Sequence, residues 1–70
     1  MPYDAISDLP ETVRGSLPKR AQKIYLDAFN SAWAEYAGTK DREEMAHRVA
    51  WSAVKRVYKK EREKWVPKKG

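Results

Sequence analysis

The absence of cysteine constrains this chain more than any other feature of its sequence. A domain of 70 residues buries only about 60% of the surface that its unfolded chain exposes, so small domains often need disulfides or a bound metal. Without cysteine, neither a disulfide framework nor a thiolate zinc site can form. We therefore expect one domain that is held together by a tightly packed core.

Features at the start of the chain and the lack of long apolar runs predict where the protein works. Residues 1–4 carry neither a basic stretch nor an apolar run, so they do not resemble a signal peptide. No apolar stretch approaches the length of a membrane span. Together with the absence of thiols, these features predict a cytoplasmic protein without stable membrane insertion.

Two Leu-Pro pairs predict helix starts. Pro10 and Pro18 each lie in the first turn of a predicted helix, where the missing N–H does no harm. We expect a short first helix that ends at Gly15. A long second helix should follow over residues 18–37, with Gly38 as its stop signal.

Capping signals support the first helix and predict a third. Asp8 and Glu11 have the spacing of a capping box, and so do Asp41 and Glu44. The second pair begins another long helix, which we expect to fray between residues 58 and 63.

Each long segment has one apolar face at helical spacing. In the second helix, this face consists of Ala21, Ile24, Tyr25, Ala28, Ala32 and Tyr36, widened by Phe29 and Trp33. In the third helix, it consists of Ala46, Val49, Ala50, Ala53, Val54 and Val57. These faces should form the core, and Asn30 should hydrogen-bond to a loop backbone and hold the short first helix in place.

The predicted fold is a mainly α, compact three-helix domain with one short and two long helices. The domain covers residues 1–66, and a basic tail follows over residues 67–70. We expect Lys64, Trp65 and Val66 to be extended and to fold back on residues 2–3. This pairing would form a small two-stranded sheet that joins the N- and C-terminal ends.

The net charge of +5 is distributed unevenly along the chain. Residues 1–54 hold seven Lys and Arg against eight Asp and Glu, whereas residues 55–70 hold eight against two. A basic end of this kind favours an anionic partner, and the alternative is a solubilising helix face. The candidate partner-binding residues are Lys55, Arg56, Lys59, Lys60, Arg62, Lys64, Trp65, Lys68 and Lys69.

Little in the sequence supports catalysis, a cofactor or a tightly bound metal. His47 is the sole histidine, and the three glycines are scattered, so neither a histidine-based triad nor a phosphate loop is expected. We interpret His47 as a polar residue beside the core, with a pH-sensitive contact to Trp51 as the alternative. The carboxylates of Asp41, Glu43 and Glu44 fit helix capping, and a weak divalent-cation site among them stays open.

A set of short segments follows a recognisable order and spacing along nearly the whole chain. These segments are Ser7-Asp8-Leu9-Pro10, Leu17-Pro18, Ala21-Gln22, Ile24-Tyr25, Ala28-Phe29-Asn30, Ala32-Trp33, Ala46-His47, Val49-Ala50-Trp51, Ala53-Val54-Lys55, Tyr58 and Lys64-Trp65. In this pattern the chain resembles the ChaB family. The loop over residues 39–44 is shorter than in ChaB proteins with a long acidic loop, so cation sensing by such a loop is not expected here.

The resemblance implies three helices with a small sheet, no catalytic residues, and a regulatory link to a cation/proton antiporter. We therefore expect a non-enzymatic monomer that docks its basic third helix and C-terminus on acidic cytoplasmic loops of such a transporter. The alternative is DNA binding by the same basic surface, which would be steeply salt-dependent. No helix-turn-helix or other base-reading signature supports that alternative.

Overall fold

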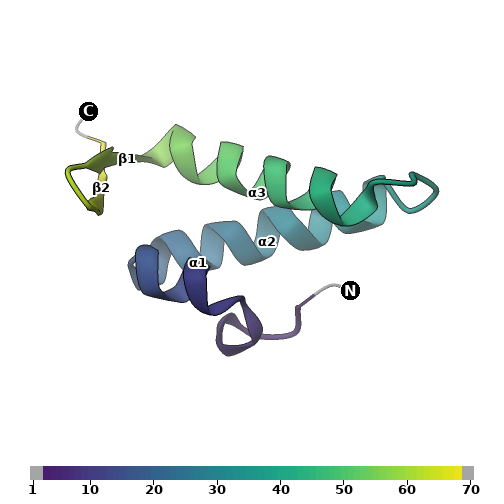
Figure 1. Cartoon of the computed structure of the whole chain (residues 1–70), viewed down its shortest axis with the longest axis horizontal. Coiled ribbons are helices and arrows are strands. Elements are labelled where there is room, and N and C mark those ends of the chain that lie inside the picture. Colours follow the sequence, from purple (N-terminus) through teal and green to yellow (C-terminus); the bar gives the residue numbers. More distant parts are fainter. Residues whose placement is uncertain (1–2, 69–70) are drawn as a thin grey trace.

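The computed structural model describes residues 3–68 (Figure 1). Two long antiparallel helices lie side by side, a short helix folds back along the first of them, and a β-hairpin extends from the second. The elements are the 3-10 turn η1 (Ile6–Asp8), α1 (Glu11–Ser16), α2 (Lys19–Glu35), α3 (Arg42–Val57), β1 (Tyr58–Glu61) and β2 (Lys64–Pro67). The predicted class, three helices with a small two-stranded sheet, is confirmed.

The core lies between α2 and α3. From α3 it receives Ala46, Ala50 and Val54, which are spaced four residues apart and fully buried. From α2 it receives the rings of Tyr25 and Phe29, which are also fully buried. Because alanine side chains are short, the α3 backbone can approach these rings closely. A short chain thus buries much aromatic area with few residues.

The N-terminal segment completes the same core. Leu9, Val13 and Leu17 are 2–4% exposed and belong to the cluster of buried residues. The Gln22 side-chain amide donates to the backbone carbonyls of Leu17 at 2.7 Å and of Arg14 at 3.1 Å. These bonds satisfy carbonyl groups that the end of α1 leaves without a helical partner.

Asn30 bonds to loop backbone, as predicted, but this backbone is that of Tyr3 at the beginning of the described chain and not of the first helix. Its Nδ2 donates to the Tyr3 carbonyl at 2.8 Å, and the Tyr3 N–H donates to its Oδ1 at 2.9 Å. The Tyr3 ring packs on Phe29, with 4.8 Å between ring centroids. The paired bonds hold the backbone of Tyr3 against α2.

The sheet does not join the two ends of the chain, so this part of the prediction is wrong. β1 and β2 form a local antiparallel hairpin in which Lys60 pairs with Trp65. Residues 1–2 lie outside the described residues, and the backbone groups of Tyr3 already bond to Asn30. A two-residue connection also costs far less loop entropy than closure over the whole chain.

The hairpin extends past the predicted domain boundary at residue 66. Pro67 pairs with Tyr58, and the Lys68 N–H donates to the carbonyl of Val57 at 2.9 Å. Two residues of the predicted tail thus take part in the fold, and residues 69–70 lie outside the described residues.

The third helix, α3, ends at Val57, before the charged residues that follow it in the sequence. Tyr58 is already extended, with φ −120° and ψ 155°, and only 4% of its surface is exposed. The expected fraying between residues 58 and 63 is therefore replaced by a strand and a turn. Burial of the Tyr58 ring favours this sharp change of direction over another helical turn.

Neither predicted capping box forms. Asp41 occupies the N-cap of α3 without a side-chain bond to the helix, and Pro10 occupies the N-cap of α1. Because α1 begins only at Glu11, Asp8 lies in the preceding turn, where it accepts from the Ala5 N–H at 3.2 Å.

Seven of the apolar residues that were expected in the core are only partly buried, namely Ile24, Ala28, Trp33, Tyr36, Val49, Ala53 and Val57. Val57 ends α3 and is 48% exposed. Trp33 is half-buried, and the Arg42 guanidinium lies 4.0 Å from its ring centroid, a cation–π contact. Arg42 Nε also donates to the Trp33 carbonyl at 2.8 Å. Leu26, which the periodicity did not mark, is buried instead.

His47 lies beside the core, as interpreted, but it contacts rings of α2. Its Nδ1 is hydrogen-bonded to the Tyr25 hydroxyl, and its ring centroid lies 4.7 Å from that of Phe29. Burial raises the pKa of Tyr25 to about 12, so this hydroxyl stays protonated and donates. Burial also lowers the pKa of His47, although Glu43, with Oε1 3.9 Å from Nε2, acts in the opposite direction.

Truncation of a core ring should cost far more stability than truncation of Val57. Phe29→Ala should lower the free energy of unfolding by about 3–5 kcal/mol, because the ring is fully buried. Val57→Ala should change it by no more than about 0.5 kcal/mol, because that side chain is half exposed. Urea unfolding followed by circular dichroism measures both. Equal losses in the two variants would contradict this assignment of the core.

Stability should fall as the pH drops below the ordinary histidine pKa. The folded chain holds His47 with a lowered pKa, so the unfolded chain takes up the proton first and gains population as the pH falls. Urea unfolding of the wild type and of His47→Gln between about pH 7.5 and about pH 5 isolates this contribution. The variant should show the shallower decline, and an identical pH slope in the two proteins would rule the mechanism out.

Candidate partner-binding surface

The predicted partner-binding residues gather at one end of the molecule. Lys55 and Arg56 lie in the last turn of α3, Lys59 and Lys60 on β1, Arg62 in the turn, Lys64 and Trp65 on β2, and Lys68 directly after it. Lys69 lies outside the described residues. We call residues 55–68 the basic end. Only two of its cations extend from a helix, so the expected basic helix is in fact mostly a basic hairpin.

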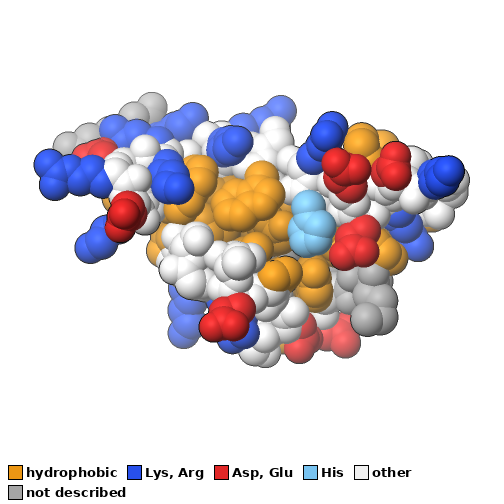
Figure 2. Space-filling view, viewed as in Figure 1, with side chains coloured by type: hydrophobic (Ala, Val, Ile, Leu, Met, Phe, Trp, Pro, Cys, Tyr) orange, Lys and Arg blue, Asp and Glu red, His pale blue; other side chains and the backbone are white. Residues whose placement is uncertain are grey.

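Positive charge at the basic end is largely unneutralised. Its seven Lys and Arg side chains are exposed, and the same segment carries only two carboxylates, Glu61 and Glu63. Lys59 Nζ lies 3.5 Å from Glu61 Oε2, an exposed pair that contributes little to stability. In Figure 2, Lys and Arg side chains crowd the hairpin end, whereas carboxylates gather beside the histidine. The basic end is therefore strongly positive, whereas carboxylates and cations are mixed at the opposite end.

An aromatic contact docks the hairpin on the helices. Tyr58 and Trp65 lie on the same face of the hairpin, because residues two apart and directly paired residues share a side. The Trp65 ring centroid lies 5.8 Å from that of Trp51 on α3, and the Tyr58 side chain is buried in the core. Trp65, predicted as a partner contact, is thus half-buried as an anchor of the hairpin.

The hairpin turn holds a strained residue. Arg62 has φ 58°, a left-handed conformation, and it is the first of the two residues between the paired Glu61 and Lys64. This position normally favours glycine, and another residue costs about 1–2 kcal/mol there. The turn thus contains a strained residue, Arg62, whose side chain is a guanidinium. Strain of this kind clusters at functional sites.

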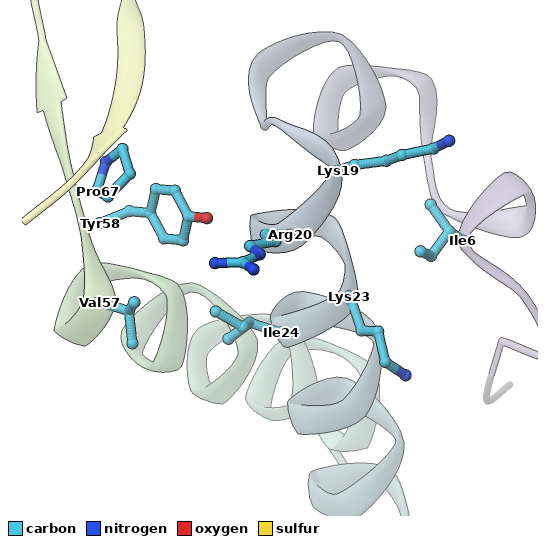
Figure 3. Close-up of a pocket in the computed structure, with 8 residues that line it drawn as sticks. All are labelled: Ile6, Lys19, Arg20, Lys23, Ile24, Val57, Tyr58 and Pro67. Atoms are coloured by element: carbon cyan, nitrogen blue, oxygen red, sulfur yellow. The ribbon is translucent and has the colours of Figure 1, made fainter.

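A solvent-open groove that the sequence did not predict lies next to the hairpin. Its volume is about 550 Å³, and it is lined by Ile6, Lys19, Arg20, Lys23, Ile24, Val57, Tyr58 and Pro67. Figure 3 shows Arg20 pointing toward Tyr58, whereas Lys19 and Lys23 point toward the side of Ile6. Five elements (η1, α2, α3, β1 and β2) contribute to the groove, so no single stretch of the sequence predicts it. The one feature of the sequence that could have indicated this groove is Val57, an apolar residue among the basic residues of segment 55–60.

A second hollow lies on the face that carries His47. It measures about 470 Å³ and is lined by Glu44, His47, Arg48, Trp51, Ser52 and Lys55. Arg48 pairs with Glu44 at 3.3 Å across one helical turn. Two of the three charged side chains that line this hollow thus pair with each other, and the third, Lys55, belongs to the basic end.

The carboxylates of the α2–α3 loop do not come together. Among residues 3–68, no three His, Asp or Glu side chains are placed so that they could hold a metal ion. Asp41, Glu43 and Glu44 are all exposed, and two of them instead lie near His47 and Arg48.

Over the same described range, none of the helices is at once long enough and apolar enough to cross a bilayer.

Comparison with known proteins extends over most of the chain. The ChaB family model matches residues 9–68. Proteins named "Putative cation transport regulator ChaB" from Escherichia coli (strain K12) and Shigella flexneri are each 53% identical over 72 residues, covering 93% of this chain and 95% of the relative. The uncharacterized 10.9 kDa protein in the LEF8-FP intergenic region of Lymantria dispar multicapsid nuclear polyhedrosis virus is 33% identical, covering 96% of this chain and 65% of that protein.

The fold agrees with a solved structure as well. The NMR solution structure of a protein with the same ChaB name is 51% identical and superposes with a TM-score of 0.84, covering 97% of this chain and all of that one. The resemblance read from the sequence is confirmed at the level of the family model, of relatives and of structure. This chain belongs to the ChaB family.

Proposed function

We propose that this chain is a non-enzymatic cytoplasmic binding protein that regulates a cation/proton antiporter. In this proposal, the basic end docks on acidic cytoplasmic segments of the transporter. The observation that carries it is the concentration of seven exposed cations over the end of α3 and the hairpin, which is anchored to the helices. The relatives named for cation transport regulation supply the class of partner.

The shape of the basic end suits recognition of an acidic protein surface. The hairpin presents its cations from both strands and from the turn, at positions that the Trp51–Trp65 contact holds in place. A preorganised patch loses less conformational entropy on binding than a flexible tail would. Its charge also steers an acidic partner toward the surface and accelerates association at low salt.

The surroundings of the sole histidine support binding over catalysis. His47 shares its Nδ1 with the buried Tyr25 hydroxyl, and its Nε2 lies toward Glu43. A histidine base needs a nucleophile or substrate within hydrogen-bond reach. Tyr25, with its raised pKa and full burial, is poorly suited to act as that nucleophile.

Charge reversal on β1 should weaken binding to the antiporter without disturbing the fold. We expect Lys59→Glu/Lys60→Glu to lower affinity at least about tenfold, or about 1.4 kcal/mol. A matched control, Lys40→Glu/Arg48→Glu, makes the same change in net charge away from the basic end and should lower it less than about threefold. The measurement is a titration of an antiporter from the same organism in lipid nanodiscs, with empty nanodiscs as background.

Two results would contradict the proposal. One is equal weakening by the two double variants, which would reduce the effect to net charge. The other comes from a parallel titration with short duplex DNA at low and physiological salt. Salt-sensitive DNA binding that disappears in Lys59→Glu/Lys60→Glu, without any binding to the antiporter, would assign the basic end to nucleic acid.

A further inference from the structure

The groove beside the hairpin combines an apolar floor with an exposed valine. Ile24 on α2, Val57 on α3 and Tyr58 on β1 meet there. Val57 is the one large apolar residue in the described part of the chain that is exposed, at 48% of its surface. A single exposed valine is ordinary, but this one borders a groove that three other apolar residues also line.

Every charged side chain that lines the groove is positive. Lys19, Arg20 and Lys23 come from the first two turns of α2, and no carboxylate lines the groove. Lys23 Nζ lies 3.7 Å from Asp27 Oδ2, but both side chains are about two-thirds exposed, so this pair is weak. Tyr58 and Pro67, on the other side, belong to the basic end. The apolar floor therefore lies between two sources of positive charge.

We propose that this groove binds an acidic amphipathic helix of a protein partner. Apolar side chains of that helix would cover Ile24 and Val57, and its carboxylates would pair with the cations of α2. Lys19 and Lys23 are one helical turn apart, about 6 Å along the axis, which matches carboxylates spaced four residues apart on the partner. This inference rests on the proposed function in that the chain acts by binding a protein, and it names the chemistry of that protein.

The distribution of the cations favours a helix over a lipid. A single anionic headgroup needs its cations gathered around one point, but Figure 3 shows Arg20 turned toward the hairpin and both lysines turned the other way. Cations that are spread along a groove match a partner with charges along its length. Docking of an apolar helix face in such a groove is a common mode of peptide recognition.

The probe is a fluorescein-labelled peptide of about 15 residues, with leucines on one helical face and glutamates elsewhere. One control peptide has the same composition in an order that gives no apolar face, and a second has lysine in place of each glutamate. Fluorescence anisotropy with the full chain should show binding of the acidic amphipathic peptide and at least about tenfold weaker binding of both controls.

A pair of variants on α3 separates the groove from net charge. Val57→Glu places a carboxylate in the groove, and Ser52→Glu adds the same charge at another exposed site on the same helix. Thermal unfolding should show both folded, because both positions are exposed. We expect Val57→Glu to weaken the peptide at least about tenfold and Ser52→Glu less than about threefold.

Unchanged binding of the peptide to Val57→Glu would overturn the inference. Tighter binding to vesicles containing phosphatidylglycerol than to the peptide, lost in Val57→Glu, would overturn it in favour of a lipid.

The antiporter titration separates the two proposals. If Val57→Glu binds the antiporter like wild type while Lys59→Glu/Lys60→Glu does not, the groove inference fails and the proposed function stands. If Val57→Glu weakens binding to the antiporter and Lys59→Glu/Lys60→Glu does not, the groove inference stands and the proposed role of the basic end fails.

Discussion

The packing of two α2 rings against the alanines of α3 is the interaction on which the rest of this structure depends. Tyr25 and Phe29 are fully buried against a helix whose contact face is made of Ala46 and Ala50. Without disulfides, this contact must hold α2 and α3 together. It also places Trp51 at the edge of the core, where its ring meets Tyr25 edge-on at 5.2 Å between centroids. The other side of that indole is left available to the hairpin.

A series of aromatic contacts holds the basic end in place. The rings pass from Tyr25 to Trp51 and from Trp51 to Trp65, so a strand at the periphery is connected to the centre of the core. Tyr58 adds a second attachment at the other end of the hairpin face. A cationic segment that would otherwise repel itself is thereby held in one conformation. The arrangement of the cations at this end is therefore set by the fold.

Much of the fold could be predicted from the sequence, because periodicity and proline and glycine placement are local signals. The faces around Tyr25 and Ala50 were identified, and α2 begins and ends within two residues of its predicted limits. The extended conformation of Lys64, Trp65 and Val66 was predicted, but their pairing with β1 was not, because the hairpin depends on Trp65 meeting Trp51, a tertiary contact. Of the candidate site, the position of the cations at one end was predicted. The groove was not, because its floor is assembled from elements far apart in the sequence.

Nitrogen-15 relaxation on the free protein shows directly whether the basic end is preformed. A preformed basic end should give order parameters near about 0.85 for the amides of Lys59, Lys60 and Trp65, equal to those of α2 and α3. Values below about 0.6 at these three amides, with rigid helices, would contradict a preformed basic end. The basic end would then be a flexible cationic tail, and its aromatic anchor would play no part in recognition.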